Sequence, residues 1–153
     1  MAYSLPNVKQ YLVDIANAVG PKFGIQSIGG WRPSDDIDPN GHPAGVALDW
    51  MTNSGGQLAD YLVANHEQLG VIQVINNGRI WTPSQGWHAY TGSNPHTDHV
   101  HSKHNPTPPA GFDISKIVVG AVAGIGGAIV DGFTGGVIDS TASAIAGVGN
   151  ALF

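Results

Sequence analysis

Residues 42–51 read HPAGVALDWM and join a histidine-bearing loop to a short apolar run. A short apolar run that follows a glycine is typical of a buried strand, and we predict one over residues 46–51. His42 and Asp49 stand near the two ends of this segment, with mostly small residues between them. Small residues would let the backbone pass close to a bound ion. The segment therefore predicts a buried strand that brings polar side chains to one place.

Helical and strand patterns alternate on both sides of this segment. Apolar residues at helical spacing predict helices over residues 7–19 and 57–69, with Gly70 as the cap that ends the second. The turn sequence Asn76-Asn77-Gly78 predicts a hairpin. The other predicted strands are residues 24–28, 71–75, 79–81 and 98–102, with long loops over residues 29–45 and 82–96. We therefore expect an α+β fold with a small antiparallel sheet and flanking helices.

The composition excludes several classes of protein. Only 11% of the 153 residues are charged, far fewer than a coiled coil carries. Hydrophobic residues make up 42% of the chain, which argues against an acidic disordered protein despite the net charge of -5. Six Lys and Arg residues cannot form a wide basic face, so we expect no nucleic-acid partner. The chain has no cysteine, which excludes disulfides and thiolate metal ligands.

The composition changes near residue 111. All seven His, all four Trp, all ten Pro and both Arg precede that position. Residues 104–111 are rich in proline and predict a stiff linker. We therefore expect a folded domain over residues 1–103, the linker, and a hydrophobic, Gly/Ala-rich helical tail over residues 112–153. The first residues lack the basic and apolar regions of a secretory signal, and no signal peptide is expected.

A second group of potential metal ligands is HTDHVH, residues 96–101. In a strand, His99 and His101 point to the same face, so both could face a metal ion. A catalytic zinc site typically has three protein ligands and one position open to water. His42, Asp49 and one histidine of the second group would provide such a set. The sequence thus predicts a Zn²⁺ site between the two segments.

These motifs resemble a known family. HPAGVALD followed by DHVH resembles the D-Ala-D-Ala carboxypeptidase/hedgehog-type zinc metallopeptidases. Over roughly residues 20–103, with GWRP and DHVH in the same order, the chain looks closest to the peptidase-like domain of actinobacterial and actinophage cell-wall lytic proteins. The resemblance implies that His42, Asp49 and His101 are the zinc ligands.

The resemblance also implies catalytic roles for three residues. Asp98 matches the carboxylate that takes a proton from the attacking water and returns it to the leaving amine. Arg32 matches the arginine that stabilises the oxyanion of the tetrahedral intermediate. His99 matches a histidine near the metal and is the alternative to Asp98 as base. Asp98 could instead orient a ligand histidine. Arg32 could instead form a salt bridge with Asp35, Asp36 or Asp38.

The other histidines and aromatic residues have less specific interpretations. The aromatic residues around His88 could stack on a sugar or peptide, or could cover the core: Trp81, Trp87 and Tyr90. His66 is expected on the surface of a helix. His96 and His104 flank the motif and are expected to take no part in the site.

The composition of the tail, residues 112–153, indicates a second role for the protein. Residues 117–138 carry one charge, Asp131, and are about as long as the roughly 20 residues that cross a bilayer. Gly120 and Gly124 form a Gly-x-x-x-Gly pair, which favours close helix packing. The segment could enter a host membrane or pack as a buried helix in a homo-oligomer or larger assembly. Together with the peptidase-like domain, it resembles a piece of a phage tape-measure protein.

We therefore expect a zinc metallopeptidase that hydrolyses peptidoglycan stem peptides, carried by a phage for local cell-wall degradation at DNA entry or lysis. Its site of action would be the virion tail or the bacterial cell envelope. Two alternatives stay open. One is a catalytically weak wall-binding module that keeps its metal. The other is a structural tail component whose hydrophobic segment interacts with a membrane.

Overall fold

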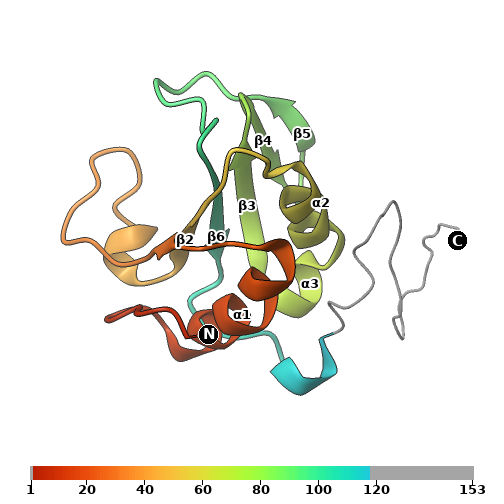
Figure 1. Ribbon diagram of the computed structural model, residues 1–153. Coiled ribbons are helices and arrows are strands. Elements are labelled where there is room, and N and C mark those ends of the chain that lie inside the picture. Colours follow the sequence, from red (N-terminus) through yellow and green to blue (C-terminus); the bar gives the residue numbers. More distant parts are fainter. Residues whose placement is uncertain (1, 118–153) are drawn as a thin grey trace, which may run out of the picture. The chain divides into compact units, whose positions relative to one another are not determined.

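The computed structural model describes residues 2–117, and the chain divides into two units, Met1–Phe112 and Asp113–Phe153 (Figure 1). In the second unit, Ile114–Lys116 form a 3-10 turn, in which the Asp113 side chain accepts from the Ser115 amide. The predicted membrane-interacting segment falls almost wholly on residues 118–153, which lie outside the described residues. Within residues 2–117, no helix is long and apolar enough to cross a membrane.

The centre of the first unit is a six-stranded antiparallel sheet. Its strands are β1 (Ile28–Gly29), β2 (Ala47–Met51), β3 (Val71–Asn76), β4 (Arg79–Thr82), β5 (Gly86–Ala89) and β6 (His99–His104), in the order β1-β2-β6-β3-β4-β5. β6 lies between β2 and β3 and is therefore a central strand (Figure 1). The predicted α+β class with an antiparallel sheet is confirmed.

Three α-helices accompany the sheet: α1 (Gln10–Val19), α2 (Gly56–Ala64) and α3 (His66–Leu69). The prediction of one continuous helix over residues 57–69 is wrong, because the helix is interrupted at Asn65. The Asn65 side chain donates to the Tyr61 carbonyl at 2.9 Å, and such local bonds compete with the helical backbone. α3 ends at Gly70, which has the left-handed φ of 67° that the predicted cap requires.

One strand is missing from the sequence prediction. Residues 82–96 were expected to form only a loop, but they contain β5, which pairs with β4 through Trp87 opposite Trp81. Its sequence, GWHA, has no β-branched residue and too little length for a periodic pattern. Pairing with β4, rather than local propensity, makes this segment a strand.

The two faces of β2 differ in burial. Leu48 and Trp50 are fully buried in the core. Asp49 and Met51 point to the opposite face, where Met51 is 40% exposed. Figure 1 shows α2 and α3 beside β3 on one side of the sheet and the long loop between β1 and β2 on the other. The sheet thus has one face packed in the core and a second face, which carries Asp49 and is exposed at Met51.

A buried chain of hydrogen bonds holds the end of β6. The Trp50 indole donates to Ser102 Oγ at 2.9 Å, and Ser102 Oγ lies 3.0 Å from His104 Nε2. His104 Nδ1 donates to the Leu69 carbonyl at 2.9 Å, so Nε2 is the nitrogen that accepts from the serine. His104 is fully buried. It is therefore a structural residue of β6 rather than the first residue of a linker.

The proline-rich segment, residues 104–111, packs against the rest of the first unit. The Asn105 amide donates to the Gly70 carbonyl at 2.8 Å, and the Tyr11 hydroxyl donates to the Asn105 carbonyl at 2.5 Å. The rings of Tyr11 and Phe112 make an edge contact at 5.3 Å. Burial raises the pKa of Tyr11 to about 12, so this hydroxyl keeps its proton. The first unit therefore extends to Phe112, beyond the boundary expected at residue 103.

The buried His104 predicts a loss of stability in mild acid. Burial lowers the pKa of His104 from 6.5 to about 4. As the pH falls through this window, the unfolded chain takes up a proton that the folded chain does not, so the free energy of unfolding decreases. Across the window the decrease is about 3 kcal/mol. Urea unfolding at pH 7 and pH 4.5 measures it.

The variant His104→Gln isolates this contribution, because glutamine does not ionise. We expect its free energy of unfolding to fall less between pH 7 and pH 4.5 than that of the unmodified chain. His88→Gln, at an exposed position of β5, is the matched control and should keep the full pH dependence. An equal pH dependence in all three chains would contradict the assignment.

Candidate metal centre

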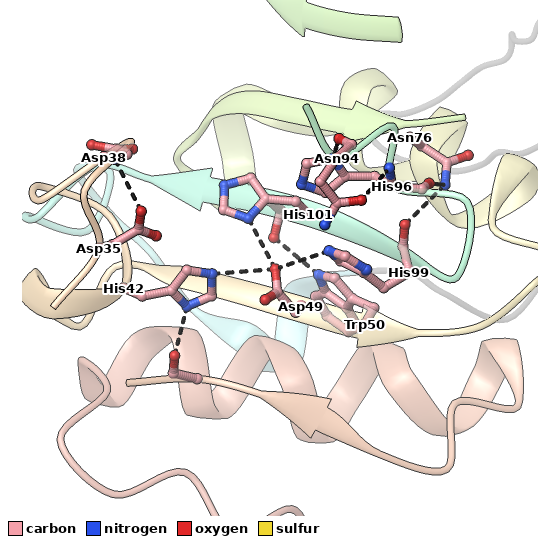
Figure 2. Close-up of polar contacts among 12 residues, drawn as sticks. Asp35, Asp38, His42, Asp49, Trp50, Asn76, Asn94, His96, His99 and His101 are labelled. Atoms are coloured by element: carbon pink, nitrogen blue, oxygen red, sulfur yellow. Dashed lines mark hydrogen bonds and ion pairs between the residues drawn. The ribbon is translucent and has the colours of Figure 1, made fainter. Parts of the chain in front are cut away.

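Three polar side chains meet on the face of the sheet that carries Asp49 (Figure 2). The register of β2 and β6 places Asp49 directly opposite His101, with both side chains on the same face. His42 comes from the 3-10 turn His42–Ala44 that precedes β2. One potential ligand atom from each residue lies within 4.8 Å of the other two. The structure thus brings together the three residues that the resemblance implied as metal ligands.

The His42 ring is oriented by the backbone around it. Its Nδ1 donates to the Gly30 carbonyl at 2.6 Å, which leaves the Nε2 lone pair directed at Asp49 (Figure 2). The turn that carries His42 ends at Gly45, whose φ is +74°. A Cβ at this position would collide with the Asn7 carbonyl. Glycine is therefore required where the chain turns from His42 into β2.

The unpaired nitrogen of His42 tests whether these residues fit a metal. Nε2 is buried, has no hydrogen-bond partner, and lies 3.2 Å from Asp49 Oδ1. Two lone pairs at this separation repel each other unless a proton or a cation lies between them. Two imidazoles and one carboxylate are also a common catalytic set of metal ligands. The group can therefore hold a metal ion.

The Asp49 carboxylate stays ionised. Burial on its own raises its pKa, but the facing imidazoles of His101 and His42 hold the pKa well below its usual range. His101 Nδ1 is 2.9 Å from Asp49 Oδ1, and His99 Nε2 is 3.7 Å from the same oxygen. A buried anion with imidazoles on several sides is the environment that a cation favours.

Arg32 lies at the rim of this group. Its guanidinium donates to Asp49 Oδ2 at 3.3 Å and to Asp35 Oδ2 at 2.9 Å. Asp38 pairs instead with Lys103 at 2.8 Å. Arg32 therefore forms the salt bridge with Asp35 that was the alternative interpretation, and it also lies beside a candidate metal ligand. Its side chain is 46% exposed, which leaves the guanidinium accessible to a bound molecule.

Asp98 reaches the group through His99. The Asp98 carboxylate accepts from His99 Nδ1 at 2.7 Å, and its own side chain is 68% exposed. This hydrogen bond lowers the pKa of Asp98. His99 therefore carries its proton on Nδ1, and its Nε2, 3.7 Å from Asp49 Oδ1, is the nitrogen without that proton. The geometry favours the alternative in which Asp98 orients a histidine.

His96 was expected to take no part in the site, but its ring lies beside two of the site histidines. His96 is buried, and its ring lies 4.6 Å from the His99 ring and 5.7 Å from the His101 ring. Its Nδ1 donates to the Asn94 carbonyl at 2.6 Å, and its φ is +58°. Burial and the neighbouring His99 lower its pKa, which favours the neutral ring. A left-handed backbone turns His96 inward, and strand alternation could not predict this.

The match to known families covers this site. Residues 4–101, well over half of the chain, match the family model described as VldE, C-terminal domain. The chain belongs to the VldE C-terminal domain family. No curated protein and no solved structure matches it.

All of the site residues lie within the VldE C-terminal domain match. It begins before α1 and ends at His101, the last candidate ligand. His104 and the docked proline-rich segment follow it. The candidate metal centre is therefore part of the VldE C-terminal domain itself.

The aromatic residues of this VldE C-terminal domain mostly have partners within the protein. Trp81 is 7% exposed and contacts the His66 ring at 4.8 Å, so His66 is less exposed than expected. The Arg79 guanidinium lies 4.6 Å from the centre of the Trp87 ring. Tyr90 makes an edge contact with His96 at 5.4 Å. Trp81 thus covers the core, and Tyr90 supports the site.

Proposed function

We propose that the protein is a zinc-dependent peptidase that hydrolyses peptide bonds of peptidoglycan. The observation that carries the proposal is the buried His42–Asp49–His101 group, in which one imidazole nitrogen has no hydrogen-bond partner. His42, Asp49 and His101 would hold a zinc ion, since two imidazoles and one carboxylate are a common ligand set of catalytic zinc. When bound, it would supply a Lewis acid for the substrate carbonyl and would acidify water near neutral pH.

His99 is suited to move the proton in this reaction. Its Nδ1 is held by Asp98, so Nε2 is the basic nitrogen on the side of the candidate ligands. Nε2 accepts a proton from the attacking water, and the resulting imidazolium is stabilised by Asp98. The same nitrogen then protonates the leaving amine. In this scheme the base is His99, and Asp98 orients and stabilises it. The resemblance implied instead that Asp98 is the base.

Arg32 is suited to stabilise negative charge. Its guanidinium already lies beside Asp49 and is accessible to solvent. When the substrate carbonyl becomes tetrahedral, its oxygen gains negative charge, to which the guanidinium can donate a hydrogen bond. The Asp35 carboxylate holds the other side of the guanidinium in place.

The choice of substrate rests on the sequence. The resemblance of residues 20–103 to cell-wall lytic proteins supports peptidoglycan stem peptides as substrate and the cell envelope as the site of action.

Digestion of purified peptidoglycan with and without a chelator tests the proposal. We expect the full chain to release new amino groups, EDTA to reduce the release to background, and added Zn²⁺ to restore it. Mass spectra of the fragments then identify the bond that is cut. Mg²⁺ added after EDTA is the control and should not restore cleavage, because it prefers oxygen ligands. Zinc and wall binding without cleavage would indicate a wall-binding module instead.

A further inference from the structure

The hydrogen-bond ladder between β3 and β6 ends close to the candidate metal centre. The last paired residues are Ile75 and His101, after which the chain turns back through Asn77 and Gly78. These two residues have φ values of 55° and 76°, as the short hairpin turn requires. The backbone of β6 before His101 therefore has no strand partner on this side.

The His99 carbonyl lies in this gap. The Asp98 carbonyl accepts from the Thr52 amide at 3.1 Å, on the side of β2. Successive carbonyls of a strand point to opposite sides, so the His99 carbonyl points toward β3. Asn76 Nδ2 donates to it at 3.1 Å. The side chain of Asn76 thus replaces the backbone donor that β3 no longer supplies.

The same amide also holds His96. Asn76 Nδ2 lies 3.3 Å from the His96 carbonyl, which accepts in addition from the Asn77 amide at 2.9 Å. The Gly78 amide donates to the Pro95 carbonyl at 2.7 Å. The hairpin turn and the segment that carries His96 and His99 are therefore joined into one hydrogen-bonded unit. Figure 2 shows Asn76 beside His96 and His99.

Asn76 has little freedom to move from this position. It is 9% exposed, and a Cβ at Gly55 would come within 3.1 Å of its amide nitrogen. The backbone at the start of α2 thus closes the space behind the amide. The Asn76 amide nitrogen has two N–H groups, one for each of the two carbonyls. Loss of this donor would leave a buried carbonyl without a hydrogen bond, which is costly.

We propose that Asn76 is a positioning residue, which sets the placement of the His96 and His99 rings beside the candidate metal ligands through its shared amide. Its effect on hydrolysis rests on the proposed function, whereas its effect on ring placement does not. Groups that orient the residues around a metal typically change activity or metal affinity by about 10- to 100-fold.

The test compares Asn76→Leu with Val74→Ala in the full chain. Leucine is close to asparagine in shape but cannot donate. Val74 is fully buried on the same strand and its aliphatic side chain cannot donate to these carbonyls, so its truncation reports general destabilisation. In the metal-free chain, we expect Asn76→Leu to shift or broaden the imidazole NMR signals of His96 and His99, but not that of His104. Val74→Ala should leave the His96 and His99 signals in place.

Activity provides the second measurement. We expect kcat for peptidoglycan hydrolysis to fall about 10- to 100-fold in Asn76→Leu, with little change in KM, because the proton carrier is misplaced while the substrate site remains. Asn76→Ser keeps one donor and should give intermediate values. If Asn76→Leu does not fold, Asn76→Ser carries the comparison.

The outcomes separate the two proposals. Ring signals and kcat in the Asn76 variants that match those of Val74→Ala would overturn the positioning role. If the unmodified chain cleaves no peptidoglycan, the proposed function fails. The ring signals of His96 and His99 still decide the role of Asn76 in that case.

Discussion

Replacing Asp49 with asparagine should abolish both stoichiometric zinc binding and hydrolysis. Asparagine keeps the shape of the side chain but removes the charge at the oxygen shared by His42 and His101. Loss of a residue that only supports a ligand weakens metal binding by about 10- to 100-fold, and loss of a charged ligand should exceed this. Metal analysis of the purified chain and a zinc competition titration measure the effect.

Asp36→Asn is the matched control for this experiment. It changes the net charge by the same amount, on the exposed loop before His42. We expect it to keep one zinc per chain and full activity.

A further comparison uses stability: zinc should raise the melting temperature of the unmodified chain, because a ligand that binds only the folded state stabilises it. One zinc per Asp49→Asn chain would refute the ligand assignment.

Replacing His99 with asparagine should lower kcat by about 10²- to 10⁴-fold, the range of general acid–base catalysis. His99 Nε2 lies 3.7 Å from Asp49 Oδ1, and His99 Nδ1 donates a hydrogen bond to the Asp98 carboxylate. Asp98→Asn should have a smaller effect, about 10-fold, since the amide oxygen still accepts from His99 Nδ1. Initial rates of amine release from peptidoglycan compare the two variants.

The order of the two effects decides which residue carries the proton. A larger loss of kcat in Asp98→Asn than in His99→Asn would make Asp98 the base, as the family resemblance implies. His88→Asn serves as the control, because His88 is an exposed histidine on β5. Zinc binding should be measured on each variant, so that a change in kcat is not mistaken for loss of the metal.

Much of the fold could be predicted because its signals are local. Helical spacing in α1, the apolar run of β2 and the Asn77-Gly78 turn each depend on a few neighbouring residues. The break at Asn65 and the strand β5 escaped prediction because competing contacts decide them. In the first, a side chain competes with the helix, and in the second a neighbouring strand supplies the pairing.

The sequence by itself determined that His42, Asp49 and one histidine of residues 96–101 are candidate ligands, because residue type, order and spacing limit what they can bind. Alternation along a strand places His99 and His101 on the same face, and the family resemblance implied His101. Only the tertiary structure decided the surroundings of these residues. The register of β2 and β6 sets Asp49 opposite His101, a left-handed backbone turns His96 inward, and Asp98 is directed to His99. These arrangements join segments far apart in the chain or depend on single backbone conformations, and neither leaves a periodic signal in the sequence.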